Sequence, residues 1–212
     1  HAFSFFANKN ITTGEGGMVT TNNFKYFKKM LMIKNQGQSS RYVHVLLGYN
    51  YRMTDLTSSF GLEQLKKIKT IIKKKNKAAN YYNKKLKNIN GLNIPQFPKY
   101  NCTSSWYNYT ISVRNEKTRN SLVKTLKTNG IDTRLSFPPL HIQKIVKKYQ
   151  RIKNKEYQQS YKSWSTLINL PIYPEITNKE QDKVINVIKK TLKLQKSRIA
   201  ECCCACSYIK SV

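Results

Sequence analysis

The stretch His1–Thr21, HAFSFFANKNITTGEGGMVTT, decides the fold of this chain. Residues 2–6 form an apolar and aromatic run whose length and composition predict a strand buried on both faces. Lys9 follows where that strand ends, and residues 12–17 contain too much glycine for a helix or a paired strand. A second apolar strand is predicted over residues 18–21. We therefore expect a lysine and a glycine loop between two buried strands.

The predicted position of Lys9 suits covalent chemistry with a carbonyl compound. An amine at the mouth of an apolar pocket loses stabilisation of its charge, so its pKa falls and the neutral amine can form a Schiff base. The chain has 32 lysines and 7 arginines, and most lysines are solvated surface groups. Spacing alone therefore does not establish a catalytic role for Lys9.

Two segments carry a more specific signal. Residues 3–17, FSFFANKNITTGEGG, and residues 48–54, GYNYRMT, resemble motifs of the DegT/DnrJ/StrS family, pyridoxal-phosphate-dependent aminotransferases that act on keto sugars attached to nucleotides. The resemblance implies an α/β fold, namely the C-terminal part of a fold-type-I aminotransferase. Family members are longer and carry the lysine segment near their middle, so we expect this 212-residue chain to be the C-terminal half.

Apolar spacing and turn residues predict the elements beyond the glycine loop. A helix is predicted over 24–34, with Asn22 or Asn23 as its cap and residues 35–37, ending in Gly37, as its stop. A loop over 38–52 and a helix capped by Thr54 or Asp55 that continues to 86 follow. The remaining predicted elements are a strand over 106–113, a helix over 116–128, a strand over 131–137, and helices over 154–168 and 178–194. Gly61 is expected to mark a close-packing point or a bend.

A proline-containing linker after Gly91 predicts the domain organisation. Residues 1–91 are expected to be the end of the large cofactor-binding domain, and residues 92–195 a small C-terminal α/β domain with helices covering one face of a short sheet. Residues 196–212 form a cysteine-rich tail that is expected to be disordered.

The resemblance implies the roles of four residues at the cofactor. Lys9 would carry pyridoxal phosphate as a Schiff base and act as the catalytic residue. Ser4 would hydrogen-bond the cofactor phosphate, and Asn50 would reach that phosphate from the other subunit of a homodimer. Arg52 would point the same way as Asn50 from an extended segment and pair with an anion. The family supplies the remaining cofactor contacts from residues before the lysine, so we expect weak or no activity from this chain alone.

Candidates on the substrate side are Glu15 in the glycine loop, Tyr42 and His44 in RYVH, and Arg134 and His141 in IDTRLSFPPLH. A lone histidine is more often structural than functional. Arg41, Arg134 and nearby lysines are alternative candidates for binding a nucleotide diphosphate. The motifs look closest to the perosamine-synthase branch, which implies amino transfer from glutamate to C4 of a nucleotide-linked 4-keto-6-deoxyhexose.

The composition and charge of the chain bear on two other classes of function, nucleic-acid binding and membrane insertion. A net charge of +29, from 39 basic and 10 acidic residues, raises nucleic acid as a partner. The lysines recur along the whole chain instead of forming one arginine-bearing patch, so we expect no specific nucleic-acid site. No apolar run approaches the ~18 residues of a membrane span and no signal peptide is visible, so a cytoplasmic protein without membrane contact is predicted.

Four of the five cysteines crowd into residues 202–206 without spaced partners, so no metal site is predicted. Two alternatives to the aminotransferase stay open at this point. One is a catalytically inactive or regulatory relic of the family, and the other is a basic nucleic-acid-binding module.

Overall fold

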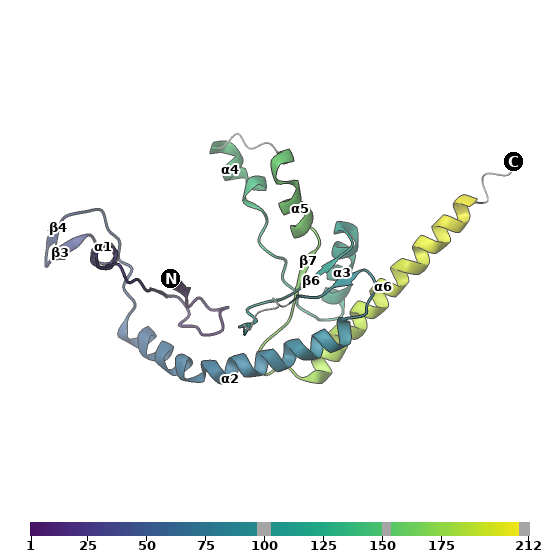
Figure 1. Cartoon of the computed structure of the whole chain (residues 1–212), viewed down its shortest axis with the longest axis horizontal. Helices are drawn as coiled ribbons and strands as arrows, with labels where there is room; N and C mark the ends of the chain where they lie inside the picture. The colour runs from purple at the N-terminus through teal and green to yellow at the C-terminus, as the bar shows by residue number, and fades with distance from the viewer. Residues whose placement is uncertain (97–102, 150–153, 208–212) are drawn as a thin grey trace. The chain divides into compact units, whose positions relative to one another are not determined.

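The computed structural model describes residues 1–96, 103–149 and 154–207. Contacts between residues divide the chain into two compact units, His1–Ile72 and Lys73–Val212, and helix α2 (Asp55–Leu86) leads from one into the other (Figure 1). The division therefore falls within α2, whereas the sequence places a domain boundary after Gly91. The domain limits 1–91, 92–195 and 196–212 stay a prediction.

The first unit begins with the two predicted strands, which form an antiparallel pair. Strand β1 (Ala2–Ser4) pairs with β2 (Gly17–Val19). Their predicted burial is wrong for this chain, because Phe3 is 47% exposed and Met18 is 48% exposed. Among the described residues β1 pairs with β2 alone, in a two-stranded sheet.

Helix α1 (Phe24–Lys34) begins and ends at the predicted residues. The side chain of Asn23 caps it by accepting a hydrogen bond from the backbone N–H of Tyr26 at 3.1 Å. Gly37 follows in the left-handed region with φ of +74°. Its N–H donates to the Met32 carbonyl oxygen at 2.8 Å, which confirms Gly37 as the helix stop.

Two backbone segments cross after α1 without room for a side chain between them. They flank a short hairpin, β3 (Gln38–Ser40) and β4 (Val43–His44), in a segment that the sequence predicts to be a loop. A Cβ on Gly37 would lie 1.7 Å from the Leu46 carbonyl oxygen, and a Cβ on Gly48 would lie 2.0 Å from the Gly37 nitrogen. Both glycines are therefore required by the crossing, which sequence reasoning did not predict.

Helix α2 begins at the predicted cap, where Thr54 Oγ1 accepts a hydrogen bond from the backbone N–H of Thr57 at 3.2 Å. It ends at Leu86, as predicted. Its part in the second unit buries Ala79 and Tyr82 completely. Among the described residues, no helix combines the length and apolar character that a membrane crossing requires.

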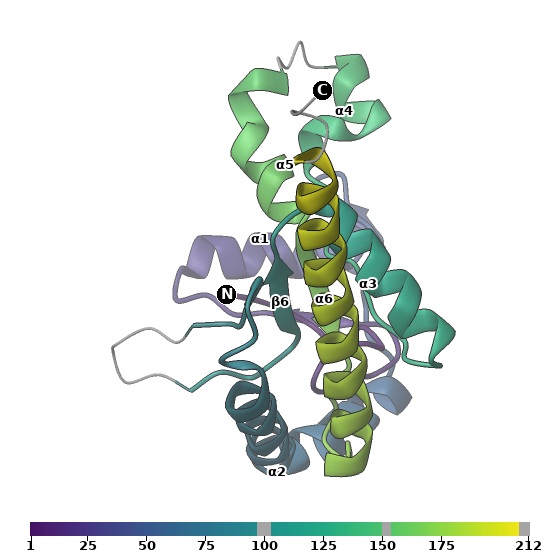
Figure 2. The ribbon, with the colours of Figure 1, turned by 90° about the vertical axis from the view of Figure 1, so that its right-hand side faces the viewer.

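The second unit contains a three-stranded antiparallel sheet in the order β5 (Leu92–Asn93), β6 (Tyr109–Val113) and β7 (Leu167–Leu170). Helix α3 (Glu116–Thr128) packs on β6 and β7 and lies beside α6 (Asn178–Ser207) (Figure 2). Helices packed on a short sheet confirm the predicted α/β class. The core is formed by buried apolar side chains of α2, the sheet, α3 and α6, among them Tyr82, Tyr109, Ile111, Leu122, Leu126, Ile168, Ile185 and Ile188.

The described residues between α3 and β7 form four short helices, η1 (Leu140–Ile142), α4 (Lys144–Tyr149), η2 (Asn154–Tyr157) and α5 (Gln158–Trp164). The strand predicted over 131–137 is wrong, apart from one bridge between Arg134 and Asn169. Leu135 and Phe137 are exposed there, so burial does not stabilise a strand.

Two predicted helix ends in this unit also differ from the structure. The helix predicted over 154–168 ends at Trp164, because the next residues pair with β6 and place Ile168 opposite Ile111 in the core. Burial against an existing strand overrides helical spacing here. Helix α6 continues to Ser207, into the tail predicted to be disordered, and no glycine or proline interrupts residues 178–207.

Two buried tyrosines link α2 to the rest of the second unit. Tyr82 Oη donates to the Pro171 carbonyl oxygen at 3.1 Å, and Tyr109 Oη donates to Asn83 Oδ1 at 2.7 Å. Burial raises the pKa of both phenols, so each stays a neutral hydrogen-bond donor at physiological pH.

We predict that Gly37→Ala destabilises the first unit by about 3 kcal/mol or more, because the added Cβ meets backbone in the crossing. Gly14→Ala is the matched control. Gly14 has φ of +78° and no atom within 4 Å of an added Cβ, so this change costs only backbone strain of about 1–2 kcal/mol. Hydrogen exchange of the Val45 amide, which donates to the Gly37 carbonyl oxygen at 2.9 Å, measures the effect locally. Equal loss of protection in both variants would contradict the crossing.

Lys75 in α2 gives a pH-dependent prediction. Its side chain is buried, and burial lowers its pKa from 10.5 to about 8. Between these two values the unfolded chain binds more protons than the folded chain, so this group makes stability rise with pH. At pH 7 we expect Lys75→Met to be more stable than the parent by roughly 1–2 kcal/mol.

The gain from Lys75→Met should shrink as the pH is raised from about 8 towards 10.5, because the free-energy cost of releasing the lysine proton on folding falls over this range and vanishes above 10.5, where the lysine is neutral in both states. Denaturant unfolding at several pH values measures this gain. Lys77→Met, at an exposed position of the same helix, is the control and should show no such trend. A gain from Lys75→Met that is the same at pH 7 and pH 10 would refute the assignment.

Candidate active site

Lys9 lies in the turn that follows β1. Its backbone N–H donates to the Phe6 carbonyl oxygen at 2.9 Å, and its side chain is half-buried. The glycine loop returns to the end of β1 at Phe5, whose N–H donates to the Gly16 oxygen and whose oxygen accepts from the Thr13 N–H, both at 2.9 Å. The turn that carries Lys9 is therefore closed by hydrogen bonds between backbone atoms.

Thr13 is the anchor of the glycine loop, and sequence reasoning missed it. It is 8% exposed, and its Oγ1 donates to the Glu15 carbonyl oxygen at 2.7 Å. A Cβ on Gly16, where φ is +144°, would lie 2.7 Å from that Oγ1. A Cβ on Gly61 of α2 would lie 2.9 Å from Thr13 Cγ2, which confirms Gly61 as a close-packing point. The only sequence signal was the pair of threonines before the glycines.

Ser4 and Glu15 flank this loop. The Ser4 hydroxyl oxygen accepts a hydrogen bond from the Phe6 N–H at 3.3 Å, and the side chain is exposed, so its own proton can be donated to a ligand. Glu15 is exposed at the tip of the loop. Ser4, Lys9 and Glu15 thus belong to one closed segment of the first unit.

Asn50 and Arg52 belong to a second segment of the same unit, which runs along the end of α1. Asn50 forms a backbone bridge with Asn35, and the Gln36 N–H donates to the Tyr49 carbonyl oxygen at 2.9 Å. Arg52 Nε donates to Asn50 Oδ1 at 3.1 Å, so the two predicted cofactor residues contact each other.

Tyr42 and His44 lie on the adjoining hairpin, and both are exposed. Tyr42 adopts a left-handed conformation with φ of +65°, and its hydroxyl accepts a hydrogen bond from Arg41 Nη2 at 3.2 Å. His44 Nδ1 lies 2.9 Å from the Gln36 carbonyl oxygen. The second segment therefore gathers Tyr42, His44, Asn50 and Arg52.

The other two predicted residues, Arg134 and His141, lie in the second unit. The Arg134 backbone is paired with Asn169 through hydrogen bonds of 3.2 and 2.9 Å, and its side chain is exposed. His141 is 6% exposed in η1, with its ring stacked on Tyr157 at a centroid separation of 5.2 Å. Packing accounts for the burial of His141.

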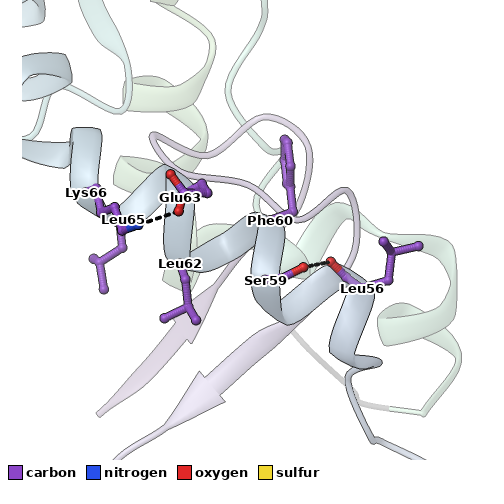
Figure 3. Close-up of a pocket in the computed structure, with 7 residues that line it drawn as sticks. All are labelled: Leu56, Ser59, Phe60, Leu62, Glu63, Leu65 and Lys66. Carbon is purple, nitrogen blue, oxygen red and sulfur yellow. Dashed lines mark hydrogen bonds and ion pairs between the residues drawn. The ribbon is translucent and has the colours of Figure 1, made fainter.

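One cavity of the first unit is separate from these residues. It measures about 640 Å³ and lies along α2 (Figure 3), where it is lined by Leu56, Ser59, Phe60, Leu62, Glu63, Leu65 and Lys66. The lining is mainly leucine and phenylalanine, and none of the predicted site residues contributes to it.

Comparison with known proteins identifies the family. The DegT/DnrJ/EryC1/StrS aminotransferase family matches residues 1–189. GDP-perosamine synthase from Vibrio cholerae is 36% identical over 193 residues, which cover 88% of this chain and 51% of that protein. The chain spans about half the length of the curated relatives it matches.

Solved structures share the fold. Spr1654 from Streptococcus pneumoniae, in its PMP form, has a TM-score of 0.82 at 23% identity, covering 93% of this chain and 52% of that one. NtdA from Bacillus subtilis with bound cofactor PMP has a TM-score of 0.78 at 26% identity, covering 91% and 45%. The family match extends over most of the sequence and includes both the lysine-loop segment and the GYNYRMT segment. This chain therefore belongs to the DegT/DnrJ/EryC1/StrS aminotransferase family.

Proposed function

We propose that this chain is the lysine-bearing half of a pyridoxal-phosphate-dependent sugar aminotransferase. The observation that carries the proposal is Lys9, held in the closed turn between β1 and the glycine loop, within a segment that belongs to an aminotransferase family. The PMP bound in NtdA, at 26% identity, supports the cofactor.

The side chains of Ser4, Lys9, Asn50 and Arg52 provide chemical groups that match those of the cofactor. Pyridoxal phosphate has an aldehyde, which reacts with an amine, and a phosphate, which takes hydroxyl, amide and guanidinium donors. Lys9 Nζ is the amine, and the exposed Ser4 hydroxyl has a proton to donate. The Asn50 amide and the Arg52 guanidinium are the further donors, joined to each other by the 3.1 Å hydrogen bond. When bound, the cofactor supplies an electron sink for the carbon that gains or loses the amino group.

Lys9 performs two tasks in this proposal. Its Nζ holds the cofactor covalently between turnovers, and after release it accepts a proton from the substrate carbon and returns it during amino transfer. The closed turn keeps the Lys9 backbone fixed while the side chain moves between these tasks, because the hydrogen bonds of Phe5 and Phe6 do not involve Nζ.

The substrates follow from the relatives. The 36% identity to GDP-perosamine synthase supports a nucleotide-linked sugar as the acceptor. Glutamate as the amino donor, and C4 of a nucleotide-linked 4-keto-6-deoxyhexose as the aminated position, are proposed from the resemblance of the motifs to the perosamine-synthase branch. Substrate contacts are proposed for the residues that sequence reasoning selected, namely Glu15, Tyr42, His44, Arg134 and His141. The burial of His141 against Tyr157 supports a packing contribution in its case.

A homodimer with a shared site completes the proposal. The lysine turn and the Asn50 segment are each internally hydrogen-bonded, and Asn50 is proposed to reach the cofactor phosphate held by the partner protomer. A cytoplasmic location and the absence of a specific nucleic-acid partner stay predictions.

We predict that the full chain mixed with pyridoxal phosphate gains near-visible absorbance and that Lys9→Ala removes it, because the attached amine is lost. Lys9→Arg should behave as Lys9→Ala does, since it keeps the charge but not the nucleophilic amine. Lys25→Ala, at an exposed position of α1, is the control and should retain the absorbance.

Retention of the absorbance in Lys9→Ala would show that another lysine holds the cofactor and would refute the assignment. Cofactor attachment at Lys9 in a longer chain that includes the residues before the lysine, without any transfer of an amino group from glutamate, would favour the inactive relic instead. Binding of an oligonucleotide more tightly than the cofactor at physiological salt would favour the nucleic-acid module.

A further inference from the structure

The second unit carries exposed lysines in regular rows on two of its helices. The rows consist of Lys117, Lys124 and Lys127 on α3 and of Lys179, Lys183, Lys190 and Lys193 on α6. We call these residues the basic surface. Neighbours within a row are three, four or seven residues apart in the sequence, and these spacings place the lysines of each helix on one side of it.

The basic surface faces away from the core on both helices. Each row lies on the side of its helix opposite the buried residues, which are Arg119, Leu122 and Leu126 on α3 and include Val184, Ile185 and Ile188 on α6. Helices α3 and α6 pack side by side (Figure 2). Lys183 Nζ lies 3.8 Å from the place that a Cβ on Gly130, just after α3, would occupy. The two rows therefore adjoin each other.

The acidic side chains of the two helices are engaged elsewhere. Asp182 Oδ1 accepts a hydrogen bond from Tyr81 Oη at 2.8 Å, and Glu180 Oε2 accepts one from the Thr177 N–H at 2.7 Å. Glu116 Oε1 lies 3.4 Å from the guanidinium group of the buried arginine of α3. Among the described residues, none of the lysines of the basic surface has an ion pair. Their charge is therefore available to an anionic partner.

The chemistry of the basic surface matches the headgroups of anionic lipids. It is built from lysine, a compact and strongly hydrated charge, and lacks the arginine fork that recognises the phosphates of nucleic acids. Neither α3 nor the described part of α6 exposes an aromatic side chain on which a base can stack. None of the large exposed apolar side chains belongs to these helices either, so nothing here inserts into a bilayer.

We propose that the basic surface adsorbs to the anionic phospholipids of a membrane surface. Adsorption through charge needs no spanning helix, so it differs from the membrane insertion that the sequence argues against. The row on α6 is about 21 Å long from Lys179 to Lys193, and lipid headgroups can move laterally to meet it. The inference goes beyond the proposed function and does not depend on it.

Co-sedimentation of the full chain with phospholipid vesicles tests the proposal. We expect binding to vesicles of equal parts phosphatidylcholine and phosphatidylserine, and no binding to vesicles of phosphatidylcholine alone. Raising the salt from about 0.1 M to about 1 M, which shortens the Debye length from about 10 Å to about 3 Å, should abolish the binding. Equal binding to both kinds of vesicle would overturn the proposal and indicate the exposed apolar side chains of the first unit instead.

Variants of α6 locate the contact. The combined substitutions Lys179→Gln, Lys183→Gln, Lys190→Gln and Lys193→Gln should weaken binding to the anionic vesicles by about a hundredfold or more, since each lysine at such a surface contributes about fivefold. Arginine at the same four positions keeps the charge and should keep the binding. Loss of binding in the arginine variant, with the helical circular dichroism retained, would also overturn the proposal.

Four exposed lysines elsewhere in the second unit provide a control of equal charge. The combined substitutions Lys77→Gln, Lys84→Gln, Lys85→Gln and Lys87→Gln should leave the binding nearly unchanged. An equal loss in the two glutamine variants would overturn the basic surface and reveal attraction to the net charge of +29.

A duplex oligonucleotide, titrated into the same proteins, separates lipid from nucleic acid. Duplex binding that depends on the four lysines of α6, together with vesicle binding that does not, would overturn the proposal in favour of nucleic acid. Vesicle binding requires no cofactor, so the loss or retention of the absorbance that depends on Lys9 does not affect this result.

Discussion

The two hydrogen bonds made by the backbone of Phe5 fix the candidate site. By donating to Gly16 and accepting from Thr13, Phe5 joins the end of β1 to both sides of the glycine loop. The turn that carries Lys9 is closed as a result. These bonds need Gly16 to adopt a positive φ and to lie close to Thr13 Oγ1. The glycines therefore shape the loop that holds Lys9 in its turn.

The same constraint reappears at the second segment of the site. Gly37 and Gly48 let two backbone segments cross, and the segment that carries Asn50 and Arg52 is hydrogen-bonded to the end of α1. Thr13 and Gly61 then seat the lysine loop on the start of α2. Close approach of backbone segments at glycine residues is therefore what orders the two segments that carry the candidate site residues.

Local sequence patterns predicted much of this molecule, and the failures have physical causes. Asn23, Thr54 and Gly37 marked helix ends correctly, because capping depends on nearby residues alone. The first two residues of β7, Leu167 and Ile168, were predicted to be helix, because their strand state depends on pairing with β6, far away in the sequence. The motifs indicated Lys9, Asn50 and Arg52, but they did not indicate the role of Thr13, because that role depends on its close contacts with Gly16 and with Gly61 of α2.

The central claim is that one lysine of 32 holds the cofactor. Borohydride reduction of the full chain with substoichiometric pyridoxal phosphate, followed by peptide mass mapping, tests it most directly. The account predicts that the reduced pyridoxyl group is found on the peptide that contains Lys9, in preference to the exposed lysines of α1 and α2. Label spread over those surface lysines, with no enrichment at Lys9, would contradict it.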